Sequence, residues 1–128
     1  MKKLLALTVA ASLAASGSVA HAQRVSKVSG RMIGSMCSNA RSAGLCDAYI
    51  AGVTDSEVWS KKFDEISNDA NAPVAFCVPA SETTARLRES VVSWLHRHDD
   101  ALTQPAAKGI YRALHEAYPC HSATEDKK

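Results

Sequence analysis

The chain has 128 residues, with 15 lysine and arginine residues against 13 aspartate and glutamate residues, and four cysteines. This length suits a single domain. The near-neutral charge removes the electrostatic driving force for non-specific nucleic-acid binding, so we expect no nucleic-acid partner.

The first 22 residues have the pattern of a secretory signal peptide. Lys2 and Lys3 precede an apolar stretch from Leu4 to Ala15, and the small-residue tripeptide Ala20-His21-Ala22 follows. The apolar stretch is shorter than the roughly 20 residues that cross a bilayer, and no second one follows. Gln23, the new N-terminus, is not a cysteine, which argues against a lipid anchor. We therefore expect a periplasmic mature chain without membrane insertion.

Two helices are predicted in the first half of the mature chain. Apolar residues from Val25 recur every three or four positions, which predicts an amphipathic helix to about Ala40. The G-x-x-x-G spacing of Gly30 and Gly34 favours close packing of a neighbouring element. A second helix is expected from near Leu45 to near Phe63.

A long loop is predicted next, because periodicity fails from Asp64 to Ala80 and asparagines and prolines interrupt the chain. Ser81 or Thr83 can then cap a third helix. Its apolar stripe consists of Leu87, Val91, Trp94, Leu95 and His98.

The third helix is expected to end at Asp99-Asp100, and Thr103 to cap a fourth helix with Pro105 in its first turn. The fourth helix is expected to stop at Pro119-Cys120. Its stripe is Ala107, Ile110, Tyr111, Leu114, Ala117 and Tyr118. The sequence thus predicts an all-α, four-helix domain over residues 23–120, after a signal peptide over 1–22 and before a polar tail over 121–128.

The four cysteines are expected to form two disulfides, because an even number in a short exported chain is typical of a disulfide framework. Sequence alone allows three pairings. Cys46 begins the second predicted helix and Cys77 precedes the third, so we predict that Cys46 pairs with Cys77, clamping the long loop. Cys37 would then pair with Cys120.

No catalytic or metal motif is found. His96, His98, Asp99 and Asp100 form the one cluster that resembles a metal site, but residues two apart on a helix do not share a face. His115-Glu116 opens an H-E-x-x-H match that Pro119 breaks. We therefore expect neither enzyme activity nor a cofactor.

Several motifs together resemble the Rap/Tai immunity proteins of type VI secretion systems. They are the run from Cys46 to Asp55 (CDAYIAGVTD), the Phe76-Cys77-Val78-Pro79 element, a helix with Val91, Val92 and Leu95 that ends at His98, and Ala113-Leu114 followed by Tyr118-Pro119-Cys120. The resemblance covers Cys46 to Cys120. It departs at Asp99, where the family often has proline.

The resemblance implies a small helical periplasmic protein that binds and blocks a peptidoglycan-cleaving amidase toxin, its cognate effector. A homodimer is a further state compatible with this interpretation. The motifs themselves indicate structural roles, including a buried tyrosine and a tight glycine, and so identify a fold rather than an interface. The structural positions, besides the cysteines, are Tyr49, Gly52, Phe76, Pro79, Trp94 and Pro119.

The partner-binding surface is predicted in the loop from Asp64 to Ala75, because an inhibitor of a cleft enzyme must present something that protrudes. Asp64, Glu65 and Asp69 would make this loop an acidic surface. Two other functions are compatible with the sequence. One is a periplasmic stress chaperone, because the mature chain's histidines would titrate on acidification. The other is an exported helical adaptor.

Overall fold

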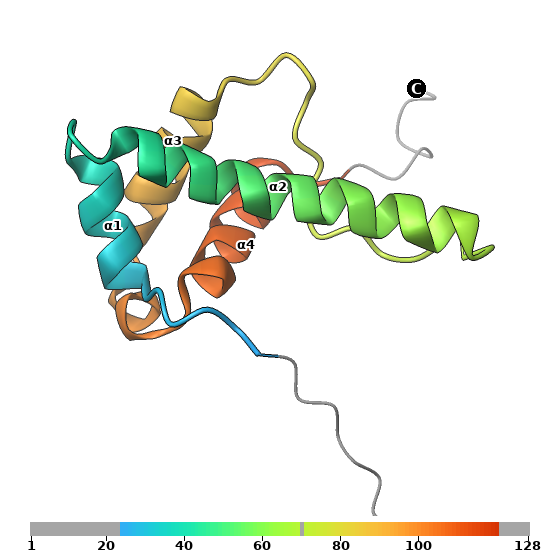
Figure 1. Ribbon diagram of the computed structural model, residues 1–128, viewed down its shortest axis with the longest axis horizontal. Coiled ribbons are helices and arrows are strands. Elements are labelled where there is room, and N and C mark those ends of the chain that lie inside the picture. Colours follow the sequence, from blue (N-terminus) through green and yellow to red (C-terminus); the bar gives the residue numbers. More distant parts are fainter. Residues whose placement is uncertain (1–23, 70, 121–128) are drawn as a thin grey trace, which may run out of the picture.

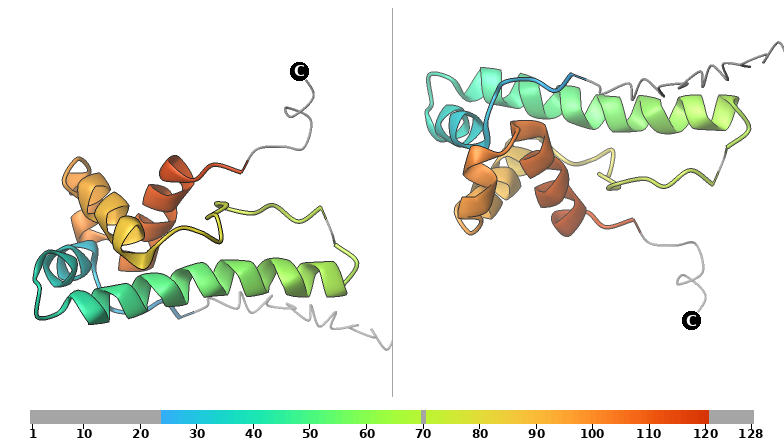
Figure 2. Two further views of the ribbon diagram at one scale, coloured as in Figure 1. Left: turned by 90° about the horizontal axis from the view of Figure 1, so that it is seen from above. Right: turned by 90° about the horizontal axis from the view of Figure 1, so that it is seen from below.

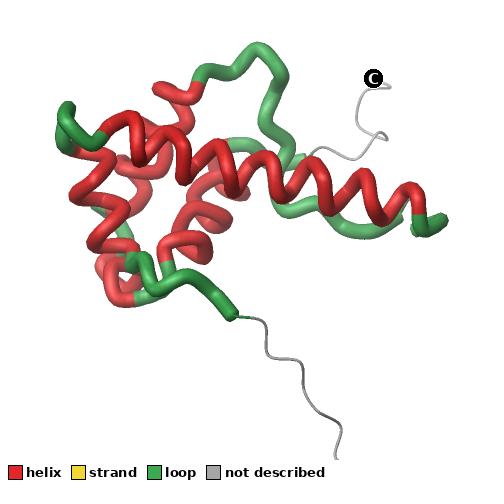
Figure 3. The backbone as a smooth tube through the Cα atoms, viewed as in Figure 1, coloured by secondary structure: helices red, strands yellow, loops and turns green. Residues whose placement is uncertain are grey.

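The computed structural model describes residues 24–69 and 71–120, which form four α-helices and one 3-10 helix (Figures 1 and 3). The α-helices are α1 (Gly30–Ser38), α2 (Ala43–Ile66), α3 (Thr84–Leu95) and α4 (Ala106–Ala117), and the 3-10 helix η1 (Asp99–Thr103) joins the last two. The all-α prediction is confirmed. The predicted signal peptide and polar tail lie outside the described residues.

The core lies where α1, α3 and α4 pack against the first half of α2 (Figure 2). The largest of its fully buried side chains come from all four helices: Ile33, Ile50, Leu95, Ile110, Leu114 and Val91. The stripes of α3 and α4 and the first half of α2 turn inward as the periodicity predicts, whereas the second half of α2 leaves large apolar side chains exposed. The second half of α2 projects beyond the other helices (Figure 1).

Helix α1 begins five residues later than the periodicity predicted. The Ser29 side chain caps it by accepting a hydrogen bond from the Met32 amide at 3.3 Å. The preceding chain is tied to α4, because the Ala106 amide donates to the Val28 carbonyl at 2.8 Å. Gly30 then packs against η1, where an added Cβ would lie 2.2 Å from the Ala101 carbonyl oxygen. The predicted close approach at Gly30 is confirmed.

Helix α2 is longer than predicted, and Asp64 and Glu65 therefore lie in its last turn rather than in a loop. The helix ends in a Schellman motif. The Asn68 amide donates to the Glu65 carbonyl at 3.2 Å and the Asp69 amide donates to the Asp64 carbonyl at 2.8 Å. Asn68 adopts the left-handed conformation that this motif requires, with φ of 64°.

The start of α4 was also predicted wrongly, because Thr103 ends η1 and does not cap the helix. Pro105 occupies the N-cap position, without a side-chain hydrogen bond. The intervening Gln104 carbonyl accepts from the Gly30 amide at 2.9 Å, which keeps this segment extended. Within α4, Ala106 is buried whereas Ala117, a predicted stripe residue, is exposed.

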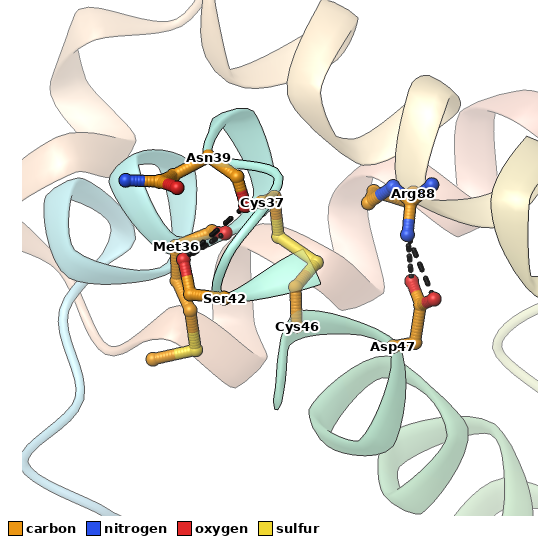
Figure 4. Close-up of a disulfide and its surroundings, with 7 residues drawn as sticks. All are labelled: Met36, Cys37, Asn39, Ser42, Cys46, Asp47 and Arg88. Carbon is orange, nitrogen blue, oxygen red and sulfur yellow. Dashed lines mark hydrogen bonds and ion pairs between the residues drawn. A yellow bond between two sulfur atoms is a disulfide. The ribbon is translucent and has the colours of Figure 1, made fainter. Parts of the chain in front are cut away.

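The two disulfides pair the cysteines differently from our prediction. Cys37 bonds to Cys46, and Cys77 bonds to Cys120. The first bond joins the last turn of α1 to the first turn of α2 across a short connection, which brings their Cα atoms to 5.0 Å (Figure 4). Cys77 instead meets the chain after α4, where its amide donates to the Tyr118 carbonyl at 2.9 Å. The predicted Cys46–Cys77 and Cys37–Cys120 pairs are wrong.

Candidate partner-binding surface

The acidic residues predicted to bind a partner lie together at the projecting end of α2. Asp64 is half-buried, while Glu65 and Asp69 are exposed. The Schellman motif fixes the backbone of all three, because it links Asp64 to Asp69 directly. We call this segment, residues 64–69, the α2 tip. Its backbone is therefore ordered before any partner binds.

The charge of the α2 tip is lower than the sequence indicated. Lys62, one turn earlier on α2, forms an ion pair with Glu65 at 3.2 Å. Both side chains are well exposed, so the pair contributes little to stability, but it neutralises one of the three carboxylates. Asp64 and Asp69 remain as the acids of the tip with no ion pair to a described residue.

The chain after the tip is held against α2 and α4 by Glu57, a residue that the sequence analysis did not single out. One carboxylate oxygen of Glu57 accepts from the Ala75 amide at 2.5 Å and the other accepts from the Tyr111 hydroxyl at 3.0 Å. Lys61 adds a hydrogen bond to the Ala72 carbonyl at 3.1 Å. Burial, and then the hydrogen bond and charge of Glu57, raise the pKa of Tyr111.

Phe76 and the Cys77–Cys120 disulfide anchor the end of this loop. Phe76 is 4% exposed, and its ring packs edge-on against Tyr111 with centroids 5.3 Å apart. Both cysteines are exposed. The Tyr118 hydroxyl donates to Glu82 at 3.0 Å, on the far side of the loop. Burial is the main cause that raises the pKa of Tyr118.

A groove of about 310 Å³ lies between α2 and the loop. Its apolar lining includes Val58, Val74, Phe76 and Val78.

Trp94 is buried as predicted, at 3% exposure, between α3 and α4. Its indole Nε1 donates to Glu116 at 2.7 Å, and the His98 ring stacks on it at a centroid distance of 3.8 Å. The Arg112 guanidinium lies 4.7 Å from the indole centroid and also bonds Asp100 at 2.9 Å. This bond is the main cause that lowers the pKa of Asp100.

Tyr49 and Gly52 are more exposed than expected. Tyr49 is half-buried, with its hydroxyl 3.4 Å from the Ser26 hydroxyl. Gly52 is not tight: a Cβ there would meet no atom within 4 Å, because this side of α2 faces outward. Pro79 and Pro119 are exposed in the segments that carry Cys77 and Cys120.

The surfaces of the described residues offer no metal centre. No group of three or more histidine, cysteine, aspartate or glutamate side chains within 24–69 and 71–120 could hold a metal ion. No helix in the described part of the chain is long and apolar enough to cross a membrane.

A family model described as Rap1a immunity proteins matches residues 29–120. The chain belongs to the Rap1a immunity protein family. The match spans all four α-helices and all four cysteines, so it covers the whole helical domain. No curated protein and no solved structure matches the chain.

Membership of the Rap1a family gives the structure a biological setting. An immunity protein acts by binding a toxin, so the family supports a protein-binding role. The disulfides Cys37–Cys46 and Cys77–Cys120 point to an exported protein, since such bonds persist in oxidising compartments.

Proposed function

We propose that this protein is a periplasmic immunity protein that binds and inhibits a peptidoglycan amidase toxin delivered by a type VI secretion system. The family match over residues 29–120 is the observation that carries the proposal. The two disulfides and the signal-peptide pattern of residues 1–22 support a periplasmic location. In this role the protein works by occupying the toxin and performs no catalysis.

The α2 tip is the surface that we assign to the toxin. It projects beyond the helical core in Figure 1, as insertion into an enzyme cleft requires. Its backbone is fixed by the Schellman motif, and the loop behind it is braced by Glu57 and the Cys77–Cys120 disulfide. A preorganised tip loses less conformational entropy on binding than a flexible loop would.

Inhibition of a purified amidase tests the function directly. The amidase for this test is chosen by searching the genes that adjoin this one for a peptidoglycan amidase. The mature protein should suppress hydrolysis of isolated peptidoglycan at equimolar amounts, and its periplasmic form should restore growth of cells that export the amidase. Normal hydrolysis with excess folded protein would refute the assignment for that amidase.

The binding role of the α2 tip is tested by replacing its acidic side chains with amides of nearly the same size and shape. We expect the D64N/E65Q/D69N variant to fold normally but to bind the amidase with a slower association rate and a weaker salt dependence, because rim charges mainly steer encounter. Surface plasmon resonance at two ionic strengths measures both. The E89Q/D99N variant, which removes two exposed acids from α3 and η1, is the control and should bind as the parent does.

An unchanged association rate and salt dependence in the tip variant would place the toxin interface elsewhere on the molecule. The inhibition assay separates the two conclusions, because a protein that inhibits normally with a neutralised tip still has the proposed function. A homodimer is the second partner that we propose.

A further inference from the structure

A groove runs between α1 and α3, at the end of the molecule opposite the α2 tip (Figure 1). It consists of two hollows of about 290 and 460 Å³, and they adjoin, because Val92 and His96 line both. We call it the α1–α3 groove. None of its residues belongs to the surface that we assign to the toxin.

Gly34 leaves the α1 side of the groove open. It is the second glycine of the G-x-x-x-G spacing, but no backbone approaches it as the η1 backbone approaches Gly30. A Cβ at Gly34 would lie 3.6 Å from the Cδ1 atom of Leu95, which is an ordinary contact. Glycine inside a helix lowers its stability, and packing within this domain does not require glycine here. Close approach of a ligand to the α1 backbone would require it.

The floor of the groove is apolar, and a cation lies at each end. Val92, Leu95 and Leu102 form the floor. Arg88 lines only the first end and Arg31 only the other. Arg31 is exposed and makes no ion pair with a described residue. The groove is therefore complementary to a ligand with an apolar middle and negative charge near both ends.

Arg88 is held in place at its end by α2. Its Nη1 atom donates to both carboxylate oxygens of Asp47, at 2.6 and 2.7 Å, beside the Cys37–Cys46 disulfide (Figure 4). The two side chains are 26% and 32% exposed. Nε and Nη2 of Arg88 have no hydrogen bond to another described residue, and a guanidinium carries donors on each of its nitrogens. Arg88 is thus oriented in advance and keeps donors for a ligand carboxylate.

The distance between the two ends sets the length of the ligand. From Arg88 to His96, which lines the same hollow as Arg31, the helix and its C-cap rise about 12 Å. An extended peptide covers that distance in about four residues. Arginine binds carboxylates better than other anions of similar size because its planar fork matches them. The groove therefore fits a short, extended peptide with a carboxylate near each end, and it is too short for a protein surface of the usual 800 Å² or so.

We propose that the α1–α3 groove binds the stem peptide of peptidoglycan, with carboxylates of the peptide on Arg31 and Arg88. The inference rests on the proposed function, which places the protein in the periplasm beside an amidase that acts on peptidoglycan. Stem peptides are short and extended, and they combine free carboxylates with the small methyl side chains of alanine. The carboxylates suit the cationic ends, and the methyl groups suit the apolar floor. Binding there keeps the protein at the cell wall, where the toxin acts.

Titration of the mature, isotope-labelled protein with a synthetic stem tetrapeptide, followed by NMR, tests the proposal. The amide signals of Gly34 and Ser35 should shift, with a dissociation constant of about 0.1–1 mM for a few charge-assisted contacts. The same peptide with its carboxylates amidated should bind at least about 10-fold more weakly, because both ion pairs are lost. Absence of shifts in α1 and α3 up to about 10 mM peptide would overturn the proposal.

Filling the groove should abolish binding. Gly34→Leu should raise the dissociation constant more than about 20-fold, because its side chain takes the space of the ligand, and leucine is a better helix former than glycine. Gly44→Leu is the matched control, since Gly44 is an exposed glycine of α2 with nothing within 4 Å of a Cβ. Circular dichroism checks that both variants fold. Parent-like binding by folded Gly34→Leu would overturn the proposal.

Changing the charge of the rim should change affinity in both directions. Arg31→Gln should raise the dissociation constant about 5- to 10-fold, whereas Lys108→Gln, at an exposed lysine of α4, should leave it unchanged. Glu89 is the one acid among the residues that line the two hollows, and Glu89→Gln should lower the constant about 2-fold by removing repulsion. Equal affinities of the parent and Arg31→Gln would overturn the assignment of that end.

Two further comparisons identify the ligand and separate this inference from the proposed function. An acidic tetrapeptide of ordinary L-residues, with glutamate at both ends and alanine between, should bind more weakly than the stem peptide. Equal or tighter binding would overturn the stem peptide as occupant. Gly34→Leu should inhibit the amidase as the parent does, because the α2 tip is unchanged. A parent that inhibits the amidase but binds no stem peptide overturns this inference alone. One that binds the stem peptide without inhibiting the amidase supports the groove and refutes the proposed function for that amidase.

Discussion

Trp94 is a buried residue whose side chain carries a polar N–H group. The ring is buried between α3 and α4, yet its one polar group is satisfied by Glu116, and His98 and Arg112 contact its ring. A buried indole N–H that lacked a partner would cost free energy. The helical spacing of α3 predicted the burial, but the partners come from α4 and from the chain after α3, which periodicity does not bring together.

The contribution of Trp94 can be measured against Trp59, the other tryptophan. Trp94→Ala should lower the free energy of unfolding by about 3–5 kcal/mol, because it leaves a cavity in the core. Trp59→Ala, at 63% exposure, should change it by less than about 0.5 kcal/mol in dilute protein. Urea unfolding followed by circular dichroism gives both values. Equal losses for the two variants would contradict the assignment of Trp94 to the core.

The two glycines Gly30 and Gly52 illustrate what residue spacing can and cannot reveal. The G-x-x-x-G spacing correctly indicated a close contact at Gly30, which the η1 backbone approaches. Gly52 belongs to a family-like motif and was expected to be tight, but it lies on the outer face of α2 with open space around it. A motif shows that glycine occurs at a position, but only the folded structure shows whether another element packs against it.

At the level of elements, α2 extends past its predicted end, which was near Phe63, to Ile66. The periodicity of apolar residues gave its start within two residues, because that half of the helix faces the core. The apolar side chains of the second half point outward, so core-facing periodicity stops before the helix does. Asn68, which takes the left-handed conformation after the last turn, was the available signal for the end.

The two disulfides differ in exposure and in the length of chain that they close. Cys37 and Cys46 are 7% and 0% exposed and close a short loop, with a sequence separation of 9. Cys77 and Cys120 are exposed and are separated by 43 residues. Access decides which bond a small reductant attacks, and loop length decides how much each bond restricts the unfolded chain.

We expect mild reductant to open Cys77–Cys120 first, leaving Cys37–Cys46 intact until the domain unfolds. Removing the longer link in C77S/C120S should cost about 4 kcal/mol, and removing the shorter one in C37S/C46S about 3 kcal/mol before any cavity effect, on the chain-entropy model. Alkylation followed by peptide mapping reports the order of reduction. Early alkylation of Cys37 would contradict the burial seen in the fold.

At the scale of the whole molecule, sequence patterns predicted features formed by residues close in the chain and missed contacts between residues far apart in it. The four helices and the core stripes follow from side chains a few residues apart. Two features depend on elements distant in the chain: the pairing of Cys77 with Cys120, and the bridge by which Glu57 joins the loop to α4. At the α2 tip, the sequence predicted the acidic residues but not the helix end and Schellman motif that fix their backbone.

Tyr111 on α4 and Tyr118 at its C-cap should make the free energy of unfolding depend on pH in the alkaline range. Tyr111 and Tyr118 both donate to carboxylates, and burial raises the pKa of each hydroxyl above its usual value near 10. In the unfolded chain they ionise at the usual value, so above about pH 10 the unfolded state binds fewer protons than the folded state. The free energy of unfolding should therefore be constant below about pH 9.5 with respect to these groups and fall as pH rises further.

Urea unfolding between about pH 8 and pH 11 measures this loss. The Y111F/Y118F variant should be less stable at pH 8, because it gives up both hydrogen bonds, but its stability should fall less steeply with rising pH. Tyr49→Phe keeps both hydroxyls and should retain the steep fall of the parent. An identical slope in the parent and in Y111F/Y118F would show that the hydroxyls of α4 do not govern alkaline unfolding. In that case the bond between Tyr111 and Glu57 would brace the loop behind the α2 tip without making the domain sensitive to alkali.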